Sequence, residues 1–367
     1  MRIKDFQKQF EVTAPVTIAW KGDNVGLLVG RENDEIQNIV VALDLTMDVA
    51  KEAKRKKANV IITHHPLLFH PVKNITAGSR IGEIVLFLIE NKINLYAAHT
   101  NLDSVKWGVN FTLAKVLGIT DVEVLSPLKD SLTSISVFVP REYVENVAEA
   151  MHSAGAGTFT KYDRCSFRSE GIGTFRGLNN SNPFLGAIGK IEKIEEVRLE
   201  MLVEQWKIGN VVSAMLQAHP YEEVAYTINP LNNNNTEYGL GAIGILPKPM
   251  KQEAFLSLIK KKLGATALKY SGKKNLIRRV AVCGGSGAEL IGDAVLQHAD
   301  AMVTADLKYH TFQDFEDNLL LIDAGHYETE HIVLPVLAKK ISQILKQNNH
   351  TGKVIITQHK TNPVHIF

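Results

Sequence analysis

Cysteine is scarce in this sequence, with only Cys165 and Cys283 among 367 residues, and neither has a second thiol near it in the chain. A disulfide framework or a zinc ribbon built from CxxC pairs is therefore excluded. An excess of charge of one sign is also missing, since 41 Lys and Arg stand against 39 Asp and Glu. The formal net charge of +2 offers no overall field that would attract nucleic acid or an anionic membrane.

Long hydrophobic runs are absent as well. No apolar run approaches the roughly eighteen residues that span a bilayer, and the first residues lack the apolar core of a secretory signal. The sequence therefore predicts a cytoplasmic protein without a membrane partner. Apolar residues make up 45% and charged residues 22% of the chain, which is typical of a globular protein, and the length predicts two or three folding units.

Strand-like and helix-like segments alternate at both ends of the chain. The predicted strands are 38–43, 59–63, 93–98, 243–246, 279–283, 301–304, 319–322 and 354–357, and the predicted helices are 47–57, 81–91, 108–117, 250–263, 287–297, 306–316 and 327–347. Short apolar strands that alternate with helices are typical of a parallel α/β sheet.

The stretch between these two α/β segments has a different pattern of predicted strands and helices. Residues 128–235 read as an α+β domain with several strands and two helices, and they end in the polar tract of four asparagines at 232–235. The sequence thus predicts one α/β core, made of residues 1–127 and 236–367, that is split by an inserted domain at 128–235.

Two adjacent histidines, His64 and His65, follow the predicted strand at 59–63. Pro66 disfavours helix at His65, so both rings should lie in an extended turn at the carboxyl end of a strand, where open α/β sheets place their ligand sites. Neighbouring side chains in an extended segment point apart, which suits one ligand for each of two ions better than joint chelation of one. For an isolated pair, surface or capping histidines are the commoner interpretation.

The next strand also ends in polar residues, with His99 and Asp103 after 93–98. Consecutive parallel strands usually lie side by side, so these residues should approach His64 and His65. Taken alone, Asp103 could be a helix cap and His99 a hydrogen-bonded ring. A carboxylate here could also bind a cation or orient a histidine.

The third cluster, His326 and Glu330, follows the strand at 319–322. Their spacing of four places both on one helical face, where a His and a Glu can chelate together, and the two oxygens of Glu330 could bridge two cations. A first-turn glutamate favoured by the helix dipole is the plain alternative. Three such clusters at three strand ends make coincidence a poor explanation.

Two further signals are weaker. The turn Gly284–Gly287 follows a strand and could cradle a phosphate, yet it matches neither a P-loop nor a full GxGxxG, and a tight turn explains it equally well. His219, in a His-Pro-Tyr-Glu-Glu stretch, could belong to a second metal site, but it has no partner ligands nearby and a structural role is favoured.

With these residues in view, the chain resembles the GTP cyclohydrolase I type 2 homologue family, the NIF-three-like dinuclear-metal proteins, along its whole length. The motifs that carry the resemblance are, in order, residues 23–30, 62–66, 98–103, 284–287 and 325–330. Residues 218–226 mark the inserted domain, which resembles the ferredoxin-like insert, akin to CutA and PII proteins, of the longer bacterial members.

The resemblance implies a paired-metal site with two divalent ions per chain. It implies that His64 and His326 bind one ion, His65 and Asp103 the other, and that Glu330 bridges both. His99 is then expected outside the ligand set, as a residue that faces the substrate or supports a ligand. The resemblance also implies a homohexameric ring. Zinc is the first expectation for the metal, with iron, manganese and cobalt as alternatives.

These residues favour a metal-dependent hydrolase of a nucleotide or phosphoester, in which Glu330 and His99 help to move protons. No GxSxG motif offers a competing nucleophile. The alternative is a regulatory or scaffold ring that senses a small ligand or partner through its insert without turnover. A DNA-associated ring is the weakest option, because the net charge does not indicate a nucleic-acid partner.

Overall fold

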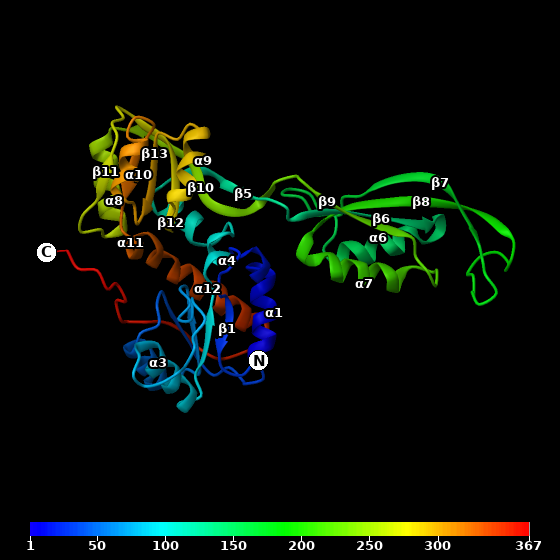
Figure 1. Ribbon diagram of the computed structural model, residues 1–367, viewed down its shortest axis with the longest axis horizontal. Coiled ribbons are helices and arrows are strands. Elements are labelled where there is room, and N and C mark those ends of the chain that lie inside the picture. Colours follow the sequence, from blue (N-terminus) through cyan, green and yellow to red (C-terminus); the bar gives the residue numbers. More distant parts are fainter. Residues whose placement is uncertain (367) are drawn as a thin grey trace. The chain divides into compact units, whose positions relative to one another are not determined.

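The computed structural model describes residues 1–366, which form two compact units (Figure 1). The first unit combines Met1–Pro127 with the segment from Glu237 onward, and the second is Leu128–Thr236. The assignment of these units as an α/β core and an inserted domain stays a prediction. The chain is an α/β protein, as the sequence predicts.

The first unit holds a five-stranded sheet whose strands are parallel except at one edge. In spatial order the strands are β1 (Gly26–Val29), β4 (Asn94–Ala97), β3 (Val60–Thr63), β2 (Ile39–Ala42) and β15 (Val354–Ile356). Its helices are α1 (Ile3–Thr13), α2 (Met47–Arg55), α3 (Arg80–Glu90) and α12 (Leu334–Gln347). Every residue of β2, β3 and β4 is buried, because helices cover the apolar strands of a parallel sheet.

A second, six-stranded sheet completes this unit. In spatial order its strands are β11 (Lys269–Ser271), β14 (Leu320–Asp323), β13 (Ala301–Ala305), β12 (Ile277–Ser286), β10 (Asn235–Met250) and β5 (Thr120–Leu128). Its helices are α5 (Val109–Val116), α8 (Gln252–Leu263), α9 (Ile291–Leu296) and α10 (Tyr309–Phe315). Alternate residues of β12 pack into two different apolar clusters, so α5 and α8 cover one face and α9 covers the other.

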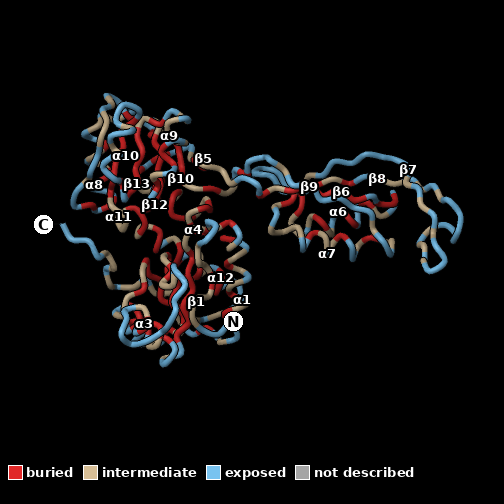
Figure 2. Tube along the Cα trace, viewed as in Figure 1, coloured by how far each residue is buried: buried red, intermediate tan, exposed pale blue. Residues whose placement is uncertain are grey.

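The two α/β segments of the sequence therefore form two sheets, where the sequence suggested a single layer. Each sheet also takes a strand from the other segment: β15, near the end of the chain, lies beside β2, and β5 lies beside β10. This exchange ties both halves of the chain into one unit, and buried residues concentrate in the strands of both sheets (Figure 2).

The carboxyl ends of the parallel strands position the polar clusters. β3 and β4 are parallel neighbours with Thr63 opposite Ala97, so the residues that follow them emerge at one edge of the first sheet. β12, β13 and β14 are likewise parallel neighbours in the second sheet. These are the positions at which open α/β sheets bind ligands.

One predicted helix is wrong in the structure. Residues 327–347 do not form one long helix but a short helix α11 (His326–Glu330), a 3-10 turn His331–Val333, and then α12. Pro335 lies in the first turn of α12, where its missing N–H costs nothing. Inside a continuous helix its ring would clash with the carbonyl of His331, so the helix restarts instead.

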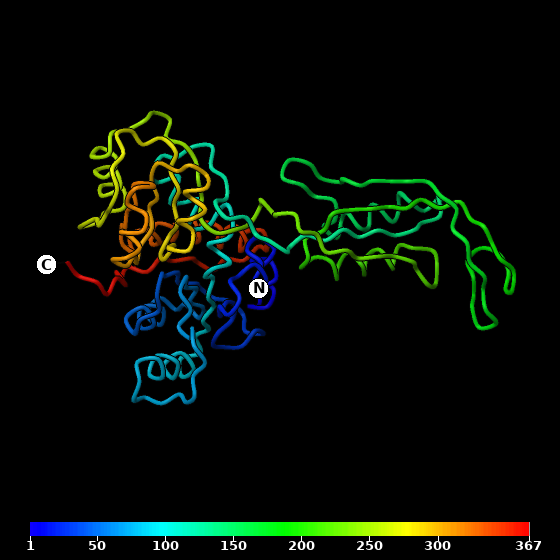
Figure 3. The backbone as a smooth tube through the Cα atoms, turned by 45° about the horizontal axis from the view of Figure 1, so that its top comes forward, coloured from blue at the N-terminus to red at the C-terminus, as the bar shows by residue number. Residues whose placement is uncertain are grey.

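The second unit has the element order βαββαβ. Its strands are β6 (Leu132–Pro140), β7 (Phe167–Arg176), β8 (Ile191–Glu204) and β9 (Tyr226–Leu231), and its helices are α6 (Val144–Ser153) and α7 (Ile208–Ala218). The sheet is antiparallel with the order β7-β8-β6-β9. Figures 1 and 3 both show α6 and α7 on the same side of it, and their apolar side chains form a core with β6 and β8. The likeness of this unit to CutA and PII proteins stays a prediction.

Among residues 1–366, no helix has both the length and the apolar character to cross a bilayer.

Candidate metal centre

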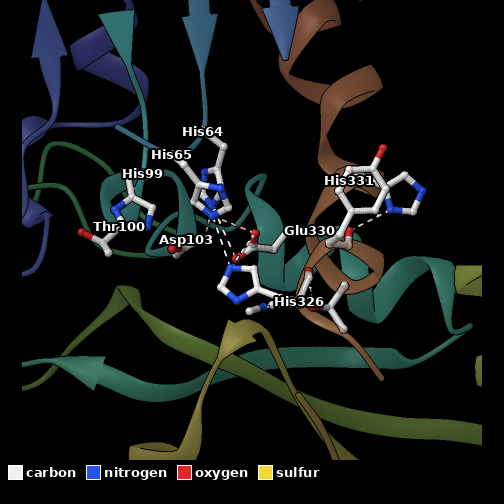
Figure 4. A network of polar contacts seen from close by, with 12 residues as sticks. His64, His65, His99, Thr100, Asp103, His326, Glu330 and His331 are labelled. Atoms are coloured by element: carbon white, nitrogen blue, oxygen red, sulfur yellow. Dashed lines mark hydrogen bonds and ion pairs between the residues drawn. The ribbon is translucent and has the colours of Figure 1, made fainter. Parts of the chain in front are cut away.

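The five predicted ligands meet in the first unit, where three strand ends converge (Figure 4). His64 and His65 directly follow β3, and Asp103 ends the short helix α4 (Thr100–Asp103) that follows β4. His326 and Glu330 are the first and last residues of α11, just beyond β14. Residues 261 positions apart in the sequence thus come into contact, since the ring of His326 touches that of His65.

Glu330 lies at the middle of this cluster. Its Oε1 is 3.7 Å from His64 Nε2, while its Oε2 is 3.0 Å from His65 Nε2 and 3.2 Å from His326 Nε2. His64 and Glu330 are buried, and His65 is half-buried. One carboxylate oxygen therefore faces His64, and the other faces both His65 and His326.

The geometry favours a different pairing from the one implied by the resemblance. His64 Nε2 lies 3.6 Å from Asp103 Oδ1, and His65 Nε2 lies 3.3 Å from His326 Nε2. His64 thus groups with Asp103, and His65 groups with His326. His65, His326 and Glu330 form one of the two groups of metal-ligating side chains whose ligand atoms all lie within 4.8 Å of one another in the described chain.

His99 belongs to the other such group, together with His64 and His65. Its ring centroid lies 5.2 Å from that of His64 and 5.5 Å from that of His65. The resemblance implies that His99 lies outside the ligand set, and its half-buried ring beside His64 and His65 suits a residue that supports a ligand or faces the substrate. Asp23 faces its other ring nitrogen, with Nδ1 to Oδ1 at 2.9 Å.

Each histidine is held from behind by an oxygen atom at its Nδ1. Asp44 Oδ1 lies 2.8 Å from His65 Nδ1, Asp306 Oδ2 lies 2.6 Å from His326 Nδ1, and the carbonyl oxygen of Ala98 lies 2.9 Å from His64 Nδ1. An acceptor at Nδ1 fixes the proton there and turns the lone pair of Nε2 toward the centre, as in many metal sites.

Sequence reasoning missed Asp44 and Asp306 as supporting residues. The available signal was their place, since Asp44 comes two residues after β2 and Asp306 directly follows β13. Asp306 also has a backbone φ of 58°, in the left-handed region that aspartate tolerates better than most residues.

Opposite charges dominate the electrostatics of the centre. Burial alone would raise the pKa of Glu330, but the rings of His326, His64 and His65 outweigh it and hold that pKa well below its usual range. Burial likewise opposes charge on His65, yet Asp44 and Glu330 raise its pKa to about 10. The pKa of Asp103 is raised, chiefly by burial. The carboxylates of Asp44 and Glu330 thus favour a proton on His65, which a bound cation would have to displace.

Three buried polar atoms at the centre lack a hydrogen bond within the described chain: His64 Nε2, Asp103 Oδ1 and Glu330 Oε2. Glu330 Oε2 lies within reach of two imidazole nitrogens, but the contacts lack hydrogen-bond geometry. Buried polar groups are normally satisfied, so converging atoms without partners fit a centre built for cations. Imidazole and carboxylate donors suit several divalent transition metals.

The glycine turn at the end of β12 contacts this centre. The backbone N–H of Gly284 donates to Asn110 Oδ1, and that of Gly285 donates to Thr329 Oγ1, at 2.9 and 3.0 Å. These donors are therefore not free to cradle a phosphate. Gly285 has a φ of 62°, and a Cβ atom there would collide with Glu330, so the tight turn exists to let the backbone approach the carboxylate.

His219 in the second unit has the structural role that the sequence favours. Its Nδ1 accepts the backbone N–H of Tyr221 at 3.1 Å, so its Nε2 carries the proton and donates to the carbonyl of Phe138 at 2.9 Å. Both ring nitrogens of His219 therefore have hydrogen-bond partners.

Two bacterial relatives match this chain along nearly its whole length. A relative from Halalkalibacterium halodurans named GTP cyclohydrolase 1 type 2 homolog is 38% identical over 357 residues, which cover 96% of each chain. A Bacillus subtilis protein of the same name is 37% identical over 357 residues, 96% of this chain and 95% of the relative.

Solved structures support the same relationship. The structure of a Bacillus cereus protein related to NIF3 matches with a TM-score of 0.90 at 36% identity, covering 100% of this chain and 99% of that one. Staphylococcus aureus protein SA1388 matches with a TM-score of 0.81 at 30% identity and the same coverage. The profile of Duf34/NIF3 (NGG1p interacting factor 3) matches residues 1–363, and the chain belongs to this family.

Proposed function

We propose that the chain binds two divalent metal ions and is a metal-dependent hydrolase of a nucleotide or another phosphoester. The observation that carries the proposal is the position of Glu330, whose Oε1 faces His64 while its Oε2 faces His65 and His326. A carboxylate with one oxygen toward each of two ligand sets suits a bridge between two cations.

His64 and Asp103 would hold one ion, and His65 and His326 the other. Zinc is the first metal to test, with iron, manganese and cobalt as alternatives, because mixed imidazole and carboxylate ligands accept all four. The carboxylates Asp44 and Asp306 would fix the rings of His65 and His326 from behind, as they do in the structure.

When bound, a pair of ions acidifies water and polarises an oxygen of the substrate. The chain itself would provide proton transfer at His99, because Asp23 fixes its Nδ1 and leaves Nε2 free at the rim. Burial opposes the charge of Asp23, but hydrogen bonds from His99 and Thr100 lower its pKa to about 2, so it stays an acceptor. We propose His99 and Glu330 as the catalytic pair.

A nucleotide is the first substrate class to test, because the relatives carry the name GTP cyclohydrolase 1 type 2 homolog. We also propose the homohexamer that the resemblance implies. A mass of six chains in light scattering would support this assembly, and a mass of one chain would contradict it.

Metal content tests the first step of the proposal. After chelation and reloading with zinc, mass spectrometry should find about two ions per chain, and Glu330→Ala should lower this number. His331→Ala is the matched control, because His331 follows the same helix but stacks on Tyr327 at 4.8 Å, away from the centre (Figure 4). Fewer than about one ion per intact chain would refute a dinuclear site.

Turnover tests the second step. The reloaded protein is assayed with GTP, other nucleotides and a generic phosphodiester, beside His65→Ala and Glu330→Ala. Metal-dependent turnover that both substitutions abolish supports the hydrolase. Turnover that survives both substitutions would refute the hydrolase proposal. Full metal loading without any turnover would favour the alternative, a regulatory or scaffold ring.

A further inference from the structure

The second unit contains a cavity of about 990 Å³ at one end of its sheet. β6 ends at Pro140, opposite Glu196, whereas β7 and β8 stay paired as far as Ile191 and so extend beyond β6. The residues after β7 and those before β9 supply further walls. This volume lies within the usual range of small-molecule sites.

Aromatic rings line the cavity: Phe138, Phe175, Phe184 and Tyr221. The ring centroid of Tyr221 lies 6.3 Å from that of Phe175 and 6.4 Å from that of Phe184, and both pairs are tilted. The hydroxyl of Tyr221 donates to Glu196 Oε1 at 3.0 Å, which sets a carboxylate beside the rings. The His219 contact described above fixes the backbone of Tyr221, whose ring lies near both Phe175 and Phe184.

The charge of the walls is negative. Four glutamates and two arginines line the cavity, namely Glu170, Glu196, Glu222, Glu223, Arg176 and Arg198. Arg198 is paired with Glu200 at 2.7 Å, and Glu170 is paired with Arg141 at 2.8 Å. The balance therefore disfavours phosphate or carboxylate ligands and favours a cation.

A metal ion fits this cavity poorly. Within residues 1–366, both groups of closely spaced metal-ligating side chains lie at the centre of the first unit. Aromatic rings in the same cavity as a carboxylate instead suit an organic cation, which the faces of aromatic rings attract.

Gly171 keeps one wall of the cavity bare. A Cβ atom added there would meet nothing within 4 Å, so a longer side chain could enter the cavity without a clash. This position offers a way to fill the site while the strand is preserved.

We propose that this cavity binds an organic cation, a quaternary or primary ammonium group on a small apolar body. The ammonium group lies against Tyr221, Phe175 and Glu196, and the apolar body occupies the remaining volume. This function goes beyond the proposed hydrolase, because every lining residue belongs to the second unit and every proposed metal ligand belongs to the first.

Choline and its neutral isostere 3,3-dimethyl-1-butanol test the proposal on the full chain, with binding followed by ligand-observed NMR. Choline should bind saturably with a Kd of about 1 mM or tighter, and the isostere at least about tenfold more weakly. No saturable choline binding, or equal binding of the two compounds, would overturn the proposal.

Substitutions locate the binding site. Phe175→Leu keeps apolar volume but removes the ring, and it should weaken choline binding about five- to thirtyfold. Phe167→Leu is the matched control, because Phe167 lies in the same strand outside the cavity and should leave binding unchanged. Equal binding by all three proteins would overturn the assignment to this cavity.

Gly171→Leu keeps the test independent of any loss of folding in the Phe175 variant. It should abolish choline binding while the circular dichroism spectrum and the metal content stay those of the intact chain. If it instead changes the mass in light scattering and choline does not bind the intact chain, another copy of the chain covers this face and the proposal is wrong.

Discussion

At the scale of single residues, the candidate metal centre depends on groups that are not among the proposed ligands. Asp44, Asp306 and the carbonyl of Ala98 each hold one imidazole at Nδ1 and so aim its Nε2 inward. A ligand set without such support would lose orientation, because an imidazole can rotate about its side-chain bonds and can carry its proton on either nitrogen.

Asp44→Asn tests this role. The amide keeps the shape of the side chain but loses the charge that fixes the Nδ1 proton of His65, so zinc affinity should fall about 10- to 100-fold. Competition with a chromophoric chelator measures the affinity. Asp48→Asn is the control, because Asp48 lies nearby in the first turn of α2 and should leave zinc affinity unchanged. An unchanged affinity for Asp44→Asn would refute the supporting role.

At the scale of elements, short connections decide where functional side chains lie. Pro335 breaks the last predicted helix, so α11 becomes a separate element that carries His326 and Glu330. In the second unit, the turn between α7 and β9 is fixed by His219, whose neutral ring accepts from Tyr221 and donates to Phe138.

The His219 turn predicts a pH dependence. Burial lowers the pKa of His219 below its usual value, against opposing effects of the Phe138 carbonyl and of Glu196. As the pH falls below about 6.5, the unfolded chain gains a proton that folded His219 resists, so the free energy of unfolding decreases until the folded pKa is reached. The imidazole C2 proton of His219, assigned with His219→Asn, should titrate in NMR with a midpoint below 6.5. A midpoint above that value would contradict the prediction.

At the scale of the whole molecule, the second unit interrupts the chain but not the candidate metal centre. All five proposed ligands lie in the first unit, on both sides of Leu128–Thr236 in the sequence. β5 and β10, which lead into and out of the insert, are neighbours in one sheet. A short linker could therefore join β5 to β10 without a change in the fold of the first unit.

Replacement of Leu128–Thr236 by a short Gly-Ser linker should leave the metal content at the value of the intact chain, because no proposed ligand is removed. Choline binding should disappear with the cavity. Mass spectrometry and ligand-observed NMR measure the two properties, and the intact chain with Glu330→Ala provides the low-metal reference. A folded variant without metal would show that the insert is needed for the centre.

Much of the candidate site could be predicted from the sequence. His64, His65, Asp103, His326 and Glu330 all follow apolar strands, and the carboxyl ends of neighbouring parallel strands must lie at one edge of a sheet. The motifs around them also identify the family, because their order and spacing are local properties of the chain.

Only the tertiary structure decided how the residues pair. Sequence spacing cannot show that His65 meets His326 while His64 meets Asp103, because this depends on how two separate sheets approach each other. Three other features also emerge only in the tertiary structure. They are the exchange of β15 and β5 between the sheets, the position of Asp44 behind His65, and the cavity beside Tyr221. Each depends on contacts between residues far apart in the chain, whereas hydrophobic periodicity and turn chemistry report only on near neighbours.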